Sequence, residues 1–79
     1  MRISELARES GTSVATIKYY LREGLLAPGE RVNAREASYG QGHVKRLRLV
    51  RAMVEVLGAS IEQVRKILRA ADDADRDPL

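Results

Sequence analysis

The sequence predicts a mainly α-helical domain of four helices, with a candidate β-hairpin between the second and the third. Four segments carry apolar residues at intervals of three and four, which is the spacing of one buried helix face. Glycines follow the first three of these segments at positions 11, 24 and 58, where a helix commonly ends. Between the second and third segments, only Val32 and residues 37–39 have strand-forming character.

The composition excludes several kinds of site. The 79 residues include no cysteine and a single histidine, His43, so disulfides and thiolate metal sites are excluded and no metal is expected at His43. No apolar run approaches the roughly 20 residues that a membrane-spanning helix needs. The N-terminus carries charges where a signal peptide would be apolar. We therefore expect a cytoplasmic protein.

The charge is distributed unevenly along the chain. The net charge is +3, but four aspartates and only one arginine lie in residues 72–79. Without that acidic end, bases outnumber acids by six in the rest of the chain. A basic body favours an anionic partner, although a solvated basic surface is the plainer interpretation of charge alone.

The first helix is predicted over residues 3–10. Ser4 is a candidate N-cap, and Gly11 tolerates the positive φ that a helix end requires. The predicted buried face consists of Ile3, Leu6 and Ala7. Only a tight turn separates this helix from the next, and two short helices joined in this way form a helix-turn-helix unit.

The second helix is predicted over residues 14–23, with Ser13 as its N-cap and Gly24 after its end. At about 100° per residue, three side chains fall on the side that must face the core. These are Val14, Ile17 and Leu21.

The outer face of this second helix predicts DNA binding. Tyr19 points away from the core side, where its ring would stand in water. Tyrosine, hydroxyl and basic side chains hold phosphate oxygens, and those near a helix N-terminus can reach base edges in a major groove. For Tyr20, core packing and DNA contact are equally supported. The candidates on this helix are Ser13, Thr16, Lys18, Tyr19, Tyr20 and Arg22.

Residues 27–38 form an irregular, polar and basic segment. Pro28 prevents continuation of the second helix. If the segment forms a hairpin, three of its side chains would lie along a phosphate backbone, and a plain connecting loop is an equally compatible interpretation. The three are Arg31, Asn33 and Arg35.

The third helix is predicted over residues 43–57 as the central core helix. Its apolar stripe contains Val44, Leu47, Val50, Val54 and Leu57, widened by Leu49, Met53 and Val56. Lys45 and three arginines near its start form either a solvated face or a second phosphate contact. His43 is expected at the surface or beside a phosphate.

The fourth helix is predicted from Ile61 to about Ala71, after a capping box between Ser60 and Gln63. Its apolar face consists of Ile61, Val64, Ile67 and Leu68. Residues 72–79 lack periodicity and are expected to form an acidic disordered tail. The ordered domain is therefore predicted to span residues 1–71.

Neither catalysis nor a cofactor is expected. The single histidine has no acidic partner within its helix turn, and the segment of residues 40–42 lacks the strand and the further glycine of a phosphate-binding loop. The carboxylates gather in the predicted tail, where nothing would hold them in place. The sequence therefore predicts a protein that is not an enzyme.

The order of these motifs closely resembles the DNA-binding domain of the MerR (mercury-resistance regulator) family over residues 2–69. The most specific part of the resemblance is Lys18-Tyr19-Tyr20 followed by Glu23-Gly24-Leu25-Leu26. The later part agrees with it through His43-Val44, Arg46-Leu47 and the Leu57-Gly58 ending before Ser60.

This resemblance implies a winged helix-turn-helix whose second helix enters the major groove of promoter DNA. The loop of residues 31–38 would be the first wing, and the third and fourth helices would make the second. Family members act as homodimers on near-palindromic sites, and they distort the DNA so that RNA polymerase can use a badly spaced promoter. Such a protein would be associated with the nucleoid. The expected DNA-binding residues are Ser13, Thr16, Lys18, Tyr19, Tyr20, Arg22, Arg31, Asn33, Arg35, Tyr39 and Lys45.

Two departures from the family pattern are visible. The wing of the family usually carries an Asn-Gly turn and a Tyr-Arg pair, whereas residues 34–38 here read AREAS, so Arg31 or Arg35 would have to replace the wing arginine. The long dimerisation helix and the effector domain of the family should follow the fourth helix. The chain is therefore expected to be either an excised DNA-binding domain or a naturally short member.

Two other functions stay open from the sequence. A helical protein-interaction domain would dock a partner helix on the wide apolar stripe of the third helix. A small excision-type or architectural DNA binder would share the fold without activating promoters. Exposed apolar area on the third helix would favour the protein partner, and basic groups converging on the second helix and the wing would favour DNA.

Overall fold

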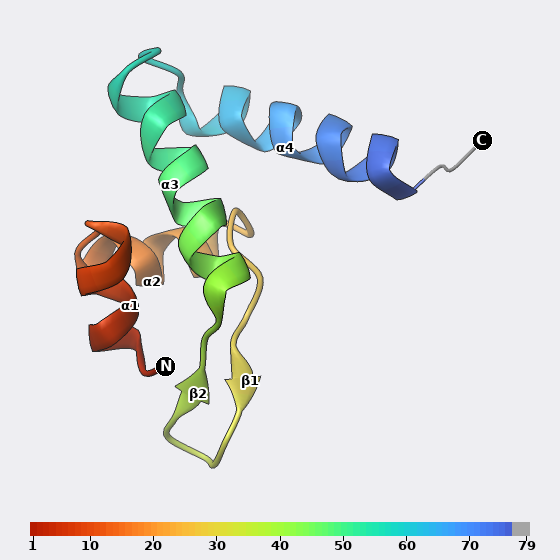
Figure 1. The fold of residues 1–79 in the computed structure, drawn as a ribbon. Coiled ribbons are helices and arrows are strands. Elements are labelled where there is room, and N and C mark those ends of the chain that lie inside the picture. Colours follow the sequence, from red (N-terminus) through yellow and green to blue (C-terminus); the bar gives the residue numbers. More distant parts are fainter. Residues whose placement is uncertain (77–79) are drawn as a thin grey trace.

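The chain folds into four helices and a two-stranded hairpin, in a computed structural model that describes residues 1–76 (Figure 1). The elements are α1 (Ile3–Ser10), α2 (Val14–Arg22), β1 (Glu30–Arg31), β2 (Ala37–Ser38), α3 (Gln41–Glu55) and α4 (Ile61–Arg76). α1 and α2 lie side by side against α3, the hairpin extends from the base of α3, and α4 projects away from the other end. The predicted winged helix-turn-helix class is confirmed.

The helix-turn-helix unit is held by its turn and by the caps of its two helices. Gly11 ends α1 with a φ of 70°, and its N–H donates to the Ala7 carbonyl. The Ser13 hydroxyl accepts a hydrogen bond from the Thr16 N–H at 3.2 Å, so the predicted cap of α2 is confirmed. The predicted cap of α1 is wrong. The N-cap residue is Arg2, which makes no side-chain cap bond, and Ser4 lies inside the helix.

The hairpin is the predicted wing, and its first strand lies two residues earlier than the predicted Val32. Glu30 pairs with Ser38, and Arg31 pairs with Ala37. The turn is closed by a side chain in place of an Asn-Gly pair. The Asn33 Oδ1 accepts hydrogen bonds from the N–H groups of Arg35 at 2.8 Å and Glu36 at 2.9 Å.

The wing is joined to the body of the domain on one side, and its two arms are packed closely together on the other. The Tyr39 N–H donates to the Met1 carbonyl at 2.7 Å, and the Met1 ammonium donates to the Tyr39 carbonyl at 2.6 Å. On the other side, Gly29 passes so close to the hairpin that an added Cβ would lie 2.8 Å from both the Ser38 carbonyl oxygen and the Tyr39 ring. Glycine is therefore needed here for the close approach of two backbone segments.

α3 is the central helix, but it begins and ends two residues earlier than predicted. Gly40 is its N-cap, and the His43 Nδ1 accepts a hydrogen bond from the Gly40 N–H at 3.1 Å. The buried stripe consists of Val44, Leu47, Val50 and Met53. The predicted stripe is wrong for Leu57, and its predicted widening is wrong for Leu49 and Val56, because all three side chains are exposed.

α4 is longer than predicted, because it continues from Ile61 to Arg76 and does not end near Ala71. The capping box is confirmed. The Ser60 N–H donates to the Gln63 Oε1 at 2.8 Å, and the Gln63 N–H donates to the Ser60 hydroxyl at 3.1 Å. Residues 72–76 therefore belong to a helix, and the rest of the predicted disordered tail, residues 77–79, lies outside the described residues. Ile67, predicted for the core face, is exposed.

The core lies between the helix-turn-helix unit, α3 and the first half of α4. Its fully buried side chains include Leu6, Ile17, Val44, Leu47, Val50 and Val64. Leu25 and Leu26, which follow Gly24, also fold back into it. Within residues 1–76, none of the helices has the length and apolar character to span a membrane.

Candidate nucleic-acid interface

α2 turns one face to the core and the other to solvent. Ile17 is fully buried, whereas Val14 and Leu21 are half-buried. The opposite face carries Ala15, Lys18, Tyr19 and Arg22, all of them exposed. The sequence-based division of this helix into a core side and an outer side is therefore confirmed.

The two adjacent tyrosines of α2 occupy different environments. Tyr19 is 37% exposed, whereas Tyr20 is 7% exposed and belongs to the core. Their ring centroids are 5.8 Å apart, and the rings are tilted by 50°. Of the two roles considered for Tyr20, the structure favours core packing. Burial raises the pKa of the Tyr20 hydroxyl above 10.0, and the charge of Glu55 adds to the effect.

A groove of about 460 Å³ lies between the start of α1, the outer side of α2 and the wing. We call it the wing groove. Four basic residues line it, namely Arg2, Lys18, Arg31 and Arg35. Among the described residues that line the groove, Glu36 alone is acidic. Its carboxylate lies 3.4 Å from the Arg2 guanidinium. An exposed pair of this kind is weak, so the groove keeps an excess of positive charge.

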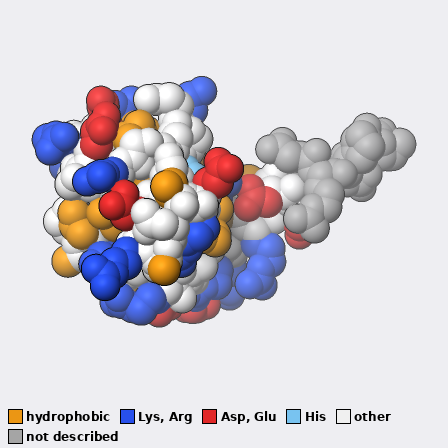
Figure 2. Space-filling view, turned by 90° about the horizontal axis from the view of Figure 1, so that it is seen from below, with side chains coloured by type: hydrophobic (Ala, Val, Ile, Leu, Met, Phe, Trp, Pro, Cys, Tyr) orange, Lys and Arg blue, Asp and Glu red, His pale blue; other side chains and the backbone are white. Residues whose placement is uncertain are grey.

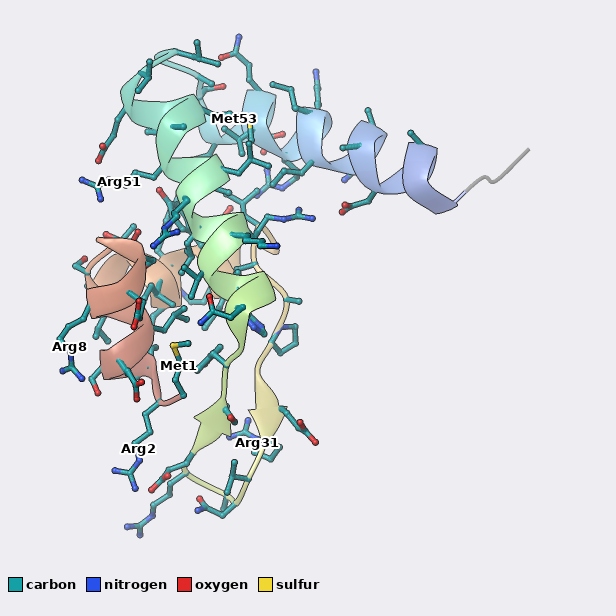
Figure 3. The ribbon with its side chains drawn as sticks, viewed as in Figure 1. Met1, Arg2, Arg8, Arg31, Arg51 and Met53 are labelled. Carbon is teal, nitrogen blue, oxygen red and sulfur yellow. The ribbon has the colours of Figure 1, made fainter. Side chains whose placement is uncertain are left out.

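Three elements far apart in sequence bring these charges together. Figure 3 shows Arg2 projecting from the start of α1 toward the end of the wing, and Arg31 on the wing itself. Viewed from that end, Lys and Arg side chains are spread over the surface with a few Asp and Glu between them (Figure 2). Groups that hold phosphate oxygens thus converge beside the outer face of α2.

The wing groove contains two residues that the sequence did not suggest. Arg2 and Ser4 line it from the start of α1. The sequence could have suggested these two residues only through their position at the N-terminus of the first helix. Backbone N–H groups lack intrahelical partners there and favour anions.

Several of the expected DNA-binding residues lie outside the wing groove or make contacts within the domain. Tyr39 is 8% exposed, borders the wing groove with its buried ring and meets His43 edge-on, with ring centroids 5.1 Å apart. The Asn33 carbonyl oxygen closes the wing turn. Lys45 is exposed on α3 but does not line the groove. Lys18, Arg31 and Arg35 are the expected residues that the fold brings together.

The arginines of α3 make contacts within the domain. Arg46 pairs with Asp72 of α4 at 2.9 Å, and Arg51 pairs with Glu55 at the same distance. The Arg48 guanidinium donates to the Glu9 carbonyl at the end of α1, at 3.1 Å. Of the two interpretations of this cluster, a second phosphate contact is therefore the less supported.

The end of α2 is tied to α4 by a single side chain. The Arg65 guanidinium donates to the Glu23 carbonyl at 3.0 Å and to the Glu23 carboxylate at 2.8 Å, and it also contacts Glu62. This contact gives a cation to the carbonyl end of the helix, where the dipole favours positive charge. It adds a polar contact between the end of α2 and α4 to the packing of Ile17 and Tyr20 in the core.

Residues 1–76 contain no group of three or more metal-ligating side chains. The histidine is also occupied, since its Nε2 lies 3.1 Å from the Ala27 carbonyl oxygen while its Nδ1 caps α3. The predicted surface role of His43 is thus replaced by a structural one.

Comparison with known proteins gives one consistent result. Residues 1–71 match the family described as MerR HTH family regulatory protein. Heavy metal-dependent transcription regulator 2 of Rhizobium meliloti (strain 1021) is 37% identical over 76 residues, which cover 96% of this chain and 51% of that protein. The mercuric resistance operon regulatory protein of Bacillus cereus is 38% identical over 71 residues, covering 90% and 53%.

A solved structure agrees with these relatives. The transcription regulator PbrR691 from Ralstonia metallidurans CH34, solved in complex with lead(II), superimposes with a TM-score of 0.84 at 28% identity. The match covers 94% of this chain and 57% of PbrR691. The chain thus spans about half the length of the relatives that it matches.

Proposed function

The chain belongs to the MerR family of helix-turn-helix regulatory proteins, and on this premise we propose that it binds double-stranded promoter DNA sequence-specifically. Members of this family are transcription regulators and not enzymes. The observation that carries the proposal is the wing groove, where Arg2, Lys18, Arg31 and Arg35 converge beside the exposed face of α2. Four cations on one concave surface match the regular negative charge of a DNA backbone.

In the proposed complex, α2 lies in the major groove. Its first turn, from Ser13 to Thr16, faces the base edges, because the N-terminal residues of a recognition helix contact the bases. Lys18 and the wing arginines hold the phosphates on one side, and the exposed hydroxyl of Tyr19 contributes from α2. Arg22 and Lys45 are exposed outside the wing groove and would contact the DNA backbone independently of it.

We extend this proposal to the activity of a complete transcription regulator. We propose a homodimer on a near-palindromic site and a distortion of the promoter that assists RNA polymerase. Two α2 helices related by a twofold axis would enter successive major grooves about one helical turn apart. A bent or untwisted duplex costs free energy that depends on its sequence, so the distortion would itself contribute to specificity. A protein of this kind acts at the nucleoid.

The proposal is tested by selecting bound duplexes from a random pool and sequencing them. We expect an enriched half-site motif, and its spacing in paired sites gives the geometry of the dimer. Competition with unrelated duplex at fixed salt measures the specificity ratio. Absence of any enriched motif, with equal binding of all duplexes, would argue for an architectural DNA binder and against a sequence-specific regulator.

A second function is favoured by a different surface. Leu49, on α3, and Val56 and Leu57, directly after it, are exposed apolar side chains. Contiguous apolar surface is typical of a protein–protein contact, so a protein-interaction role is the second candidate. None of these residues lines the wing groove, so both functions are compatible. Sedimentation at increasing concentration, with Leu49→Ser as the variant, tests whether a second copy uses this surface.

A further inference from the structure

The first turn of α2 presents one exposed side chain without a polar group. Ala15 is the second residue of the helix, and its methyl group is exposed. Tyr19 follows four residues later, which places its exposed ring on the same face. Together the methyl group and the ring edge form a small apolar surface on the outer side of α2.

The neighbouring hydroxyl of Ser13 is used within the helix. It donates to the Thr16 Oγ1 at 2.9 Å and accepts from the Thr16 N–H at 3.2 Å. Because a serine hydroxyl has one hydrogen, Ser13 has none left to donate to a base. Thr16 is itself half-buried, so the first turn offers few polar groups for recognising base edges.

The cations of the interface lie to one side of this turn. Lys18 lines the wing groove together with Arg2 and Arg31, and these positions suit the phosphate backbone. The residues that contact the bases would then lie in the first turn of α2. Ser13 and Ala15 are the exposed residues of that turn, and Ala15 is the one whose side chain is apolar and small enough for the helix to approach the bases closely.

We propose, on the basis of the proposed DNA-binding function, that Ala15 is a specificity-determining residue that contacts the C5-methyl group of a thymine. Thymine is the one base that presents a methyl group in the major groove, and apolar side chains such as alanine recognise it. The contact selects a T·A pair at one position of each half-site, without a hydrogen bond from the protein.

The test uses a duplex obtained from the selection experiment, in which each thymine is replaced in turn by deoxyuridine. Deoxyuridine keeps every hydrogen-bonding group and lacks only the methyl. We expect one thymine in the half-site at which this replacement lowers the affinity of the unmodified protein by about fourfold, the ratio that corresponds to burial of one methyl group. In Ala15→Gly the same replacement should leave the affinity unchanged.

The matched control is Ala70→Gly, which places a glycine at an exposed position of α4, outside the wing groove. It carries a similar cost in helix propensity and should retain the full thymine dependence. Specific binding with no thymine that responds to methyl removal overturns the proposal for Ala15 alone, as does a dependence that persists in Ala15→Gly. Failure to select any specific duplex overturns the proposed function and this inference together.

Discussion

Tyr19 and Tyr20 show how one step along a helix separates a buried side chain with a folding role from an exposed one with a proposed binding role. A step of about 100° moves the side chain from the core side of α2 to its exposed side. Tyr20 packs with Ile17 and Leu47 in the core, whereas Tyr19 keeps more than a third of its surface in solvent. Substitutions at these two positions should therefore affect different properties, namely stability at Tyr20 and DNA affinity at Tyr19.

Tyr20→Phe should change the pH dependence of stability. Burial, followed by the charges of Glu55 and Tyr19, raises the pKa of the Tyr20 hydroxyl above its unfolded value of 10.0. The folded state thus holds the proton more tightly, so this stabilisation is complete below pH 10 and is lost as the pH rises above it. Urea unfolding from about pH 8 to about pH 11 should show a steeper loss for the unmodified protein than for Tyr20→Phe. Parallel curves for the two proteins would contradict the raised pKa of Tyr20.

Lys18→Ala should weaken DNA binding while leaving the helices intact. Lys18 is exposed and lines the wing groove, so its removal deletes a phosphate contact and no core packing. We expect about a tenfold loss of affinity at low salt, equivalent to about 1.4 kcal/mol for one charge-assisted hydrogen bond. Affinity is measured by fluorescence anisotropy and helicity by circular dichroism.

Lys66→Ala is the matched control for this prediction, because Lys66 is exposed on α4 and does not line the wing groove. Tyr19→Ala should lower affinity in the same experiment without loss of helicity. Unchanged affinity in both Lys18→Ala and Tyr19→Ala would remove this face of α2 from the interface.

At the scale of elements, the serine caps predicted where α2 and α4 begin, whereas the start of α3 was predicted wrongly. Ser13 and Ser60 cap α2 and α4 as expected, since serine at these positions supplies the missing acceptor. α3 begins at Gln41, two residues before the predicted start, because Gly40 has no side chain and His43 makes the cap from inside the helix. Histidine in this role is not a usual capping signal.

The apolar periodicity of the sequence did not predict where α3 and α4 end. Apolar spacing assigned Leu49, Val56 and Leu57 to the core, but no other element of the described chain covers them. α4 continues through its aspartates, one of which pairs with Arg46. Lys18, Arg31 and Arg35 were candidates from the sequence, whereas Arg2 joins them in the wing groove through tertiary packing.

His43→Ala should destabilise α3 at its first turn. The substitution removes the acceptor for the Gly40 N–H, the edge-on contact with Tyr39 and the hydrogen bond to the Ala27 carbonyl. Loss of a helix cap typically lowers the free energy of unfolding by about 1 kcal/mol. Chemical denaturation measures the change, with Gln41→Ala, exposed in the same turn, as the control. A loss of equal size in the control would show that His43 has no capping role.

At the scale of the whole molecule, the distribution of charge determines how the domain meets DNA. Acidic side chains near the end of α4 lie on the element that projects away from the body, whereas the wing groove collects cations from α1, α2 and the wing. The Arg65 contact to Glu23 connects the first part of α4 with the end of the proposed recognition helix.

Binding to DNA should weaken steeply as salt rises. Each phosphate that a cation neutralises releases counterions, which contributes a slope of about −0.9 to the logarithm of affinity against the logarithm of salt concentration. If the four cations of the wing groove each hold one phosphate, the groove contributes a slope of about −3.6. Arg35→Ala should make the measured slope shallower by about 0.9, and Arg69→Ala, exposed on α4, should leave it unchanged. A slope near zero would argue that the partner of this domain is a protein, because apolar association does not release counterions.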